Sequence, residues 1–471
     1  MLFVIGTQVV ADPLQELEMA VAKDFELLNY PATPWRTFDP DVCDVAIIGA
    51  GMRGLALAFS LQLEGITNVK VFDAACEGKE GPWLTSARMK TLRSGKKLQG
   101  PACGIPHLTF RAWYEAQYGQ EAWDTLGNIP TALWGDYLTW LKKTMQLDVE
   151  NSHALDSIVP NDDNTLTLYF SNQVVQKARH VVLATGRSGF GGPQLPHFAS
   201  PLPKKFWAHT SEEIDISFFK DKRICVIGAG SSAFDAAGCA LENGAKSVQM
   251  LMRRSALPKK NLFAMQSFRG FHYGFYFLSD EARCELFCKA LEAGIPPPED
   301  SLKRVEKFST FKLHDSTSTD HIEVGHESML IHTNKGRMAA DFIIFATGYD
   351  IDGAHQKELS FFFDKIRLWK DQVETLSDKF GNFPYLGQYF EFLPKEGQEA
   401  YYLDRIHCFN YGAFLSSGRI SGDIDCFEVG VRRLVEGLVQ KLFLETSFVE
   451  VGPDNCSCTC PGSCSLSLDT Y

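Results

Sequence analysis

Two segments of the chain have the residue types and spacing that bind phosphate. Each follows a short apolar run and opens a stretch of small residues, which predicts a strand, a tight turn and a helix whose N-terminus meets a pyrophosphate. Two such segments predict a protein that binds two dinucleotides and passes electrons between them. The first, DVAIIGAGMRG, contains Gly49, Gly51 and Gly54, and the second, RICVIGAGSSA, contains Gly228, Gly230 and Ala233.

The residue that ends the following strand indicates which nucleotide each segment prefers. Asp73 ends VKVFD, 24 residues after Gly49, where a carboxylate accepts hydrogen bonds from ribose hydroxyls. This predicts FAD at the first segment. Arg253 and Arg254 follow SVQMLM, and guanidinium groups there suit a 2′-phosphorylated ribose, so NADPH is expected over NADH. The alternative for the two arginines is a solvated basic turn.

A second pair of segments repeats in the same order. HVVLATGRS and DFIIFATGYD each read as a buried strand that ends in Ala-Thr-Gly, with Gly186 in the first and Gly348 in the second. A glycine at this point lets the backbone run close to a nucleotide or to a domain crossing. The repeat predicts an α/β fold with two Rossmann-like dinucleotide-binding domains, the NADPH domain being inserted into the FAD domain.

The chain resembles the flavin-dependent monooxygenases with two dinucleotide-binding domains, a group that includes flavin-containing monooxygenases, Baeyer-Villiger monooxygenases and amine N-hydroxylases. The resemblance covers roughly residues 41–442 and rests on GAGMRG, the Gly-Pro-Trp step that ends at Trp83, GAGSSA and ATGYD. It implies cofactor contacts for Asp73 and Trp83, a flavin-side position for Met89 within ARMKTLRS, and a ribityl contact for Asp423. Trp83 fits a core position equally well.

One departure from this family concerns His209. Flavin-containing and Baeyer-Villiger enzymes carry Phe-x-Gly-x-x-x-His-x-x-x-aromatic between the two fingerprints, whereas here Pro203 and Lys205 precede the histidine and Glu213 follows it. Oxidation of ketones is therefore disfavoured. His209 is kept as the candidate catalytic residue at the domain junction, with an ordinary linker residue as the alternative.

The expected chemistry follows from the order of the cofactors. NADPH transfers hydride to FAD, the reduced flavin reacts with O2, and the resulting peroxyflavin donates one oxygen atom to a small-molecule substrate in a site that excludes water. A hydroperoxide donates oxygen to soft nucleophiles such as amines and thioethers, so N- or S-oxygenation is predicted. The alternatives are an NADPH-dependent reductase or oxidase without oxygen insertion, Baeyer-Villiger oxygenation, and a nucleotide-bound regulatory protein without turnover.

The expected domain organisation divides the chain into five parts. Residues 1–40 form a helical extension, 41–203 the first part of the FAD domain, 204–350 the NADPH domain, 351–450 the rest of the FAD domain with the substrate region, and 451–471 a flexible Cys-rich tail. Apolar residues at helical spacing predict one helix in the extension and one late helix. These stripes are Leu14, Leu17, Val21, Phe25 and Leu28, and Phe427, Val431, Leu434, Leu438 and Leu442. Aromatic-rich segments 407–414 and 108–119 are candidate substrate-pocket walls.

Composition limits the remaining classes. The formal net charge is -12, which disfavours nucleic acids as partners, and no apolar run reaches membrane-span length. MLFVIGTQVV lacks a basic region and is read as a strand or docking segment, so a cytoplasmic enzyme is expected. Of 13 cysteines, those before the tail form no Cys-x-x-Cys pair, which argues against disulfide reductases. No metal site is predicted, and the sequence does not fix the oligomeric state.

Overall fold

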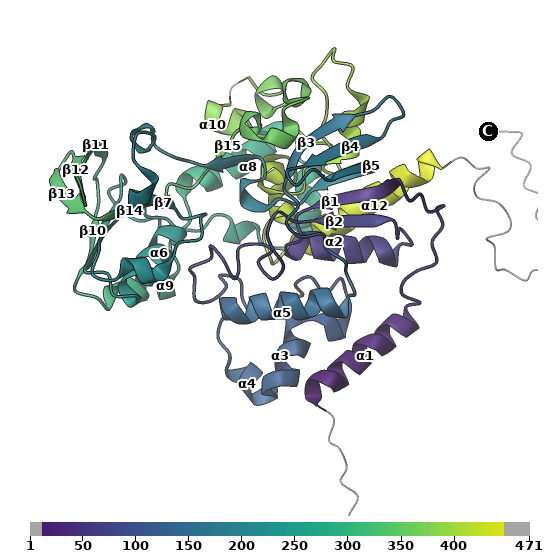
Figure 1. The fold of residues 1–471 in the computed structure, drawn as a ribbon, viewed down its shortest axis with the longest axis horizontal. Coiled ribbons are helices and arrows are strands. Elements are labelled where there is room, and N and C mark those ends of the chain that lie inside the picture. The colour runs from purple at the N-terminus through teal and green to yellow at the C-terminus, as the bar shows by residue number, and fades with distance from the viewer. Residues whose placement is uncertain (1–11, 375, 447–471) are drawn as a thin grey trace, which may run out of the picture.

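The computed structural model describes residues 12–374 and 376–446, which form two α/β units side by side (Figure 1). The first sheet has the strand order β2-β1-β5-β4-β3, and β16 pairs with β5. Strands β1, β2, β5 and β16 are parallel, whereas β3, β4 and β5 form an antiparallel meander. The bounds are β1 Val42–Ile48, β2 Val69–Phe72, β3 Leu155–Pro160, β4 Leu166–Phe170, β5 Val175–Leu183 and β16 Ile406–His407.

The second sheet has the order β10-β9-β8-β14-β7, and every pairing in it is parallel. Helices α6, Ser231–Glu242, and α9, Glu299–Glu306, pack on one of its faces. The strands are β7 Trp207–His209, β8 Arg223–Ile227, β9 Ser247–Leu251, β10 Phe311–His314 and β14 Phe342–Phe345. The predicted class, α/β with two Rossmann-like domains, is confirmed.

A third, antiparallel sheet covers the other face of the second sheet. Its strands β11 Thr319–Val324, β12 Met329–Thr333 and β13 Gly336–Ala340 pack through Met329 and Ile331 against Ile343 and Phe345. It lies at the far end of the molecule from the first sheet (Figure 1).

The two connections between the units are hydrogen-bonded to each other. Strand β6, Gly191–Pro193, leaves the first unit, strand β15, Tyr349–Ile351, returns to it, and the two pair antiparallel. The Gln194 amide also donates to the Gly348 carbonyl at 2.9 Å. The two connections between the units thus form one two-stranded ribbon.

Helices α1, α3, α4 and α5 form a layer beside the first sheet, below it in Figure 1. Their bounds are α1 Pro13–Leu27, α3 Phe110–Tyr118, α4 Gln120–Thr125 and α5 Thr131–Thr144. In α1, which begins after the N-cap Asp12, the apolar face is buried at Leu17, Val21 and Phe25, whereas Leu28 is exposed. Phe110, Trp113 and Tyr114 of α3 are buried and stabilise this layer, whereas Tyr118 is exposed.

The late apolar stripe forms α12, Phe427–Glu445, which packs on α2, Met52–Leu63. All five predicted stripe residues are buried. The other helices are α7 Arg269–Gly274, α8 Asp280–Ala293, α10 Asp378–Gly381 and α11 Phe414–Ser417. Among the described residues, none of these helices is long and apolar enough to cross a membrane. The opening MLFVIGTQVV segment and the Cys-rich tail lie outside the described residues.

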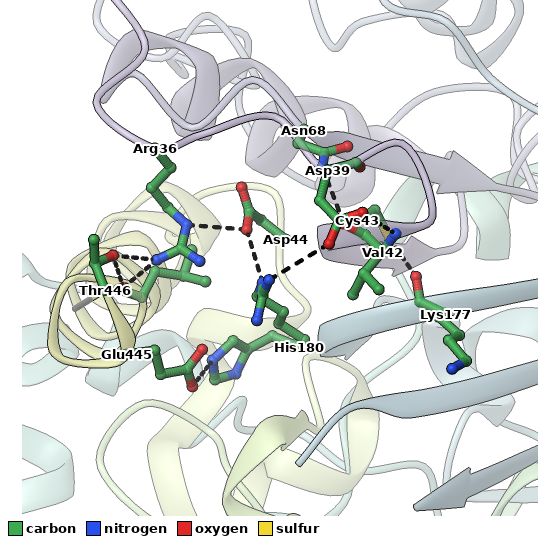
Figure 2. Close-up of polar contacts among 12 residues, drawn as sticks. Arg36, Asp39, Val42, Cys43, Asp44, Asn68, Lys177, His180, Glu445 and Thr446 are labelled. Carbon is green, nitrogen blue, oxygen red and sulfur yellow. Dashed lines mark hydrogen bonds and ion pairs between the residues drawn. The ribbon is translucent and has the colours of Figure 1, made fainter. Parts of the chain in front are cut away.

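The C-terminal end of α12 is held to the first sheet by buried charges (Figure 2). Arg36 donates to the Asp44 carboxylate of β1 at 3.0 Å and to the Leu442 carbonyl in the last helical turn, which also accepts from the Thr446 hydroxyl at 2.9 Å. Glu445 pairs with His180 of β5 at 3.2 Å. Burial raises the pKa of Asp44, and Arg36 acts against this shift. The pairs therefore fix where the last helix lies on the sheet.

The buried His180 of this cluster and its neighbour His407 predict a loss of stability in acid. Burial lowers the pKa of both His180 and His407 below the ordinary value of 6.5. The unfolded chain consequently binds more protons than the folded chain just below pH 6.5, and the free energy of unfolding falls as pH drops, by up to ~1.4 kcal/mol per pH unit for each histidine.

His407→Asn should flatten this dependence of stability on acid pH, because it removes one of the two titrating rings. The Asn amide can keep the bond that the ring Nδ1 makes to the Tyr389 carbonyl, so the fold should survive. Urea unfolding at several pH values between 5 and 7 measures the slope. His355→Gln is the control, since His355 is exposed. An equal slope in both variants would contradict the assignment.

Candidate functional site

The first fingerprint forms a turn that only glycine can occupy at two of its positions. Gly49 has φ +109°, and a Cβ there would lie 2.6 Å from the Ala184 carbonyl oxygen. A Cβ on Gly54 would lie 1.9 Å from the Gly49 carbonyl oxygen. Gly51 is the N-cap of α2 and offers no side-chain cap, so the first amides of the helix remain available to an anion.

The second fingerprint repeats this geometry. Gly228 has φ +119°, and a Cβ there would lie 2.3 Å from the Ala346 carbonyl oxygen. Gly230 is the uncapped N-cap of α6, and a Cβ on it would meet nothing within 4 Å. Ala233 is fully buried. Ala184 and Ala346 belong to the two Ala-Thr-Gly segments, so the sequence repeat reflects one contact made twice.

One cavity of about 1820 Å³ joins the two fingerprints. Its volume exceeds the range of about 300–1,000 Å³ typical of a single small-molecule site, and both uncapped helix N-termini open on it. This shape fits two nucleotides that meet end to end. Most predicted site residues line it, namely Gly49, Gly51, Asp73, Trp83, Met89, Gly186, Gly228, Gly230, Ala233, Arg253, Arg254 and Gly348.

Three predicted site residues do not line this cavity. Gly54 lies beneath Gly49 as a packing residue. His209 is fully buried, and Asp423 forms an ion pair with Arg419 beside Gly422, which does line the cavity. Any influence of these three residues on a group bound in the cavity would therefore pass through the neighbours that line it.

Asp73 is buried at the cavity wall and holds the turn together. Its carboxylate accepts from the Ala50 amide at 2.7 Å and from the Ala75 amide at 2.8 Å. Burial raises its pKa, and these backbone bonds act against the shift. Each oxygen keeps a further lone pair, so the expected ribose contact is compatible with these bonds.

The two predicted phosphate-binding arginines differ in their surroundings. Arg254 donates to the carbonyls of Ala293 and Glu292, at 2.9 and 2.8 Å, and so caps the C-terminal end of α8. Arg253 is exposed, and no hydrogen bond or ion pair joins it to another described residue. Arg253 is therefore the freer donor for a phosphate.

The segment around Met89 connects the two units. Arg93 forms an ion pair of 2.7 Å with Asp235 on α6, a carboxylate that Ser301 also contacts at 2.7 Å. Arg88 donates to the Thr210 carbonyl at 2.9 Å. Because Asp235 is almost wholly buried, its contact with Arg93 fixes α6 against this segment of the first unit.

His209 lies behind the cavity wall. Its Nδ1 is 2.8 Å from the Ser211 hydroxyl, and its ring packs edge-on against Tyr349 at 5.7 Å. Ser211 and Tyr349 both line the cavity. Burial lowers the pKa of His209 below 6.5, so the ring is neutral at neutral pH.

Sequence reasoning missed a cationic and aromatic part of the wall. Arg187, directly after the first Ala-Thr-Gly, lies 4.8 Å from the Tyr411 ring centroid and 6.0 Å from that of Tyr349. Arg53 faces the cavity from α2, and burial lowers its pKa to about 10. The available signal was the position of both arginines beside glycine motifs.

The two aromatic segments proposed for the substrate pocket have different positions. Tyr411 and Phe414 of segment 407–414 line the cavity, whereas segment 108–119 contributes nothing to its wall. Phe110 and Tyr114 of this segment are buried in the helical layer, whereas Trp113 and Gln117 line a second cavity of about 570 Å³. A substrate-pocket role for 108–119 stays a prediction.

Comparison with known proteins shows the family to which this chain belongs. Residues 46–267 match the family model for pyridine nucleotide-disulphide oxidoreductases. The chain is 34% identical to the FAD-dependent urate hydroxylase of Xanthomonas campestris over 92% of this chain and 93% of that protein. The chain therefore belongs to the flavin-dependent monooxygenases, and the family predicted from sequence is confirmed.

Solved structures of low sequence identity share the fold. Ornithine hydroxylase from Pseudomonas aeruginosa superposes with a TM-score of 0.68 at 17% identity, over 85% of this chain and 100% of that chain. The ornithine N-hydroxylase of Kutzneria sp. 744 gives 0.65 at 15% identity, over 85% and 100%.

Gly51→Val should remove FAD while the fold survives. Gly51 has φ -65°, and an added Cβ would meet only the Gly81 Cα, at 3.9 Å, but it would occupy the space of a pyrophosphate. The flavin absorbance of the purified variant and its circular dichroism spectrum measure the two effects. Full FAD content in a folded variant would contradict the site. Gly54→Val is the contrasting variant, expected not to fold.

Arg253→Ser should reduce the preference for NADPH over NADH by about tenfold or more, since one charge-assisted hydrogen bond contributes roughly 1.5–3 kcal/mol. Rates of flavin reduction with each nucleotide give the ratio. Arg254→Ser should keep more of the preference for NADPH than Arg253→Ser does, because the Arg254 guanidinium is bound to the end of α8. The opposite ranking of the two variants would move the phosphate contact to Arg254.

Proposed function

We propose that the protein is an NADPH- and FAD-dependent monooxygenase that inserts one atom of O2 into a small, electron-rich, nitrogen-containing substrate. The observation that carries this proposal is the single cavity that joins two phosphate-binding helix N-termini. Such a cavity lets hydride pass from one nucleotide to the other without leaving the protein. The 34% identity to a urate hydroxylase supports oxygen insertion.

The residues of the chain would bind, orient and shield. The amides at the start of α2 and the Asp73 carboxylate would hold FAD, and those at the start of α6 with Arg253 would hold NADPH. Bound FAD, once reduced, supplies the activation of O2. Trp83 and Met89 line the cavity between the units, where apolar side chains would exclude water from the reacting atoms.

The wall around Arg187 favours an anionic or planar substrate. A guanidinium between two tyrosine rings can receive a negative charge and leave aromatic faces for stacking. Within the described ranges, the contacts of the Arg187 guanidinium are these two rings, and no ion pair with a carboxylate occupies it. A urate-like nitrogen heterocycle is therefore the first candidate. N- or S-oxygenation of an amine or thioether is the second, supported by the fold shared with ornithine hydroxylases.

His209 acts in this proposal as a positioning residue. Its neutral ring would orient the Ser211 hydroxyl and the Tyr349 ring, which line the cavity.

The cytoplasm is the proposed location, since the nine cysteines of the described ranges are all free thiols, as a reducing compartment keeps them.

The test is incorporation of 18O from labelled O2 in the presence of NADPH and urate, with a panel of amines and thioethers in parallel. One labelled oxygen per NADPH is expected in the hydroxylated product. Arg187→Gln should raise the KM for urate about tenfold or more and leave flavin reduction unchanged. Hydrogen peroxide equal to the NADPH consumed with every compound would replace the proposal by an oxidase.

A further inference from the structure

The small antiparallel sheet carries three metal-ligating side chains on one face. In the register of β11 with β12, His321 lies opposite His332, and Glu323 lies two residues along β11 on the same side. Alternate residues of a strand point to opposite faces. Ile322 and Ile331, one position away, pack inward against the second sheet. The strand pairing therefore gathers the three polar side chains on the outward face.

The three side chains converge on a common point. The two imidazole rings are stacked, with centroids 4.1 Å apart and 17° between their planes. Their Nε2 atoms lie 2.9 Å (His332) and 3.7 Å (His321) from the same Glu323 oxygen. The ligand atoms all lie within 4.8 Å of one another.

His332 Nε2 supplies an independent observation. This atom is buried and makes no hydrogen bond of acceptable geometry, although the Glu323 carboxylate is close by. The Glu323 oxygen at 2.9 Å is its polar neighbour but is poorly placed for a hydrogen bond, and a buried ring nitrogen whose hydrogen bond is poor is costly. A cation placed between the nitrogen and the carboxylate would satisfy both groups.

We propose that His321, Glu323 and His332 form a binding site for one divalent transition-metal ion of the zinc class. Two imidazoles and one carboxylate are ligands that Zn²⁺ accepts, with bond lengths of about 2.0–2.2 Å, and a water molecule would complete the tetrahedron. Small rotations of the exposed His321 and Glu323 side chains, 59% and 60% exposed, bring the ligands to this spacing. The site differs from the sequence expectation of no metal, and it is distinct from the nucleotide cavity.

One neighbouring charge opposes the ion. Arg337 of β13 lies opposite His332 on the same face, and its exposed guanidinium would repel a cation. Arg337→Gln should therefore strengthen metal binding. The ion would clamp β11 to β12, and β11 starts at Thr319, which lines the nucleotide cavity together with Thr317 and Ser318.

The test is calorimetric titration of the FAD-loaded full-length protein with Zn²⁺. The wild type should bind one equivalent of Zn²⁺ that His332→Asn and Glu323→Gln each fail to bind, or that each of them binds about tenfold or more weakly. The Co²⁺ difference spectrum between wild type and His332→Asn should show ligand-field bands without thiolate charge transfer, which separates this site from cysteine thiolates such as those at Cys456–Cys464.

His326→Gln is the matched control, because His326 is exposed in the turn between the same two strands. It should keep the full metal stoichiometry. FAD content and the melting temperature in metal-free buffer should be equal in all variants. Equal Zn²⁺ binding by the wild type and His332→Asn, or an equal loss in His326→Gln, would overturn the proposal.

Discussion

The architecture depends on a close backbone contact that occurs once in each unit. The first glycine of each fingerprint approaches the alanine carbonyl of an Ala-Thr-Gly segment so closely that a methyl group would not fit between them. The contact joins β1 to β5 in one unit and β8 to β14 in the other. It sets the path of the chain into α2 and α6, and therefore decides where two uncapped helix N-termini point. The cavity is a consequence of making this contact twice.

Charges and apolar side chains across the domain boundary then decide how the two units face each other. The pair Arg93–Asp235 is buried on the Asp235 side and 42% exposed on the Arg93 side, whereas Phe263 and Phe287 of the inserted unit share a buried core with Phe383 of the first unit. An inter-domain interface with a buried apolar part resists relative motion more than a polar one. The apolar contact therefore holds the two units together on one side, and the ion pair joins them on the other.

The sequence predicted the elements whose signals are local. Glycine spacing, strand-end charges and apolar periodicity located both fingerprints, both Ala-Thr-Gly segments and the buried face of α12. It could not distinguish Arg253 from Arg254, because the carbonyls that occupy Arg254 come from the end of α8, about 40 residues away. Nor could the sequence separate the core residue Phe110 from the cavity-lining Trp113 in segment 108–119, since aromatic residues look alike in a pocket and in a core. The pairing of His321 with His332 depends on strand register, which no local pattern specifies.

The paired strands β6 and β15 have a consequence for how such a chain can be assembled. Because the segment enters and leaves the NADPH unit at neighbouring points on one ribbon, residues 194–348 have adjacent ends. Adjacent ends alone favour insertion of such a piece into a host loop. This segment, however, is also bound through its middle, because Phe287 packs against Phe383 and Arg433 of α12 donates to the Tyr273 carbonyl. An exchange of the inserted unit would therefore have to keep α8, or the first unit would lose part of its own core.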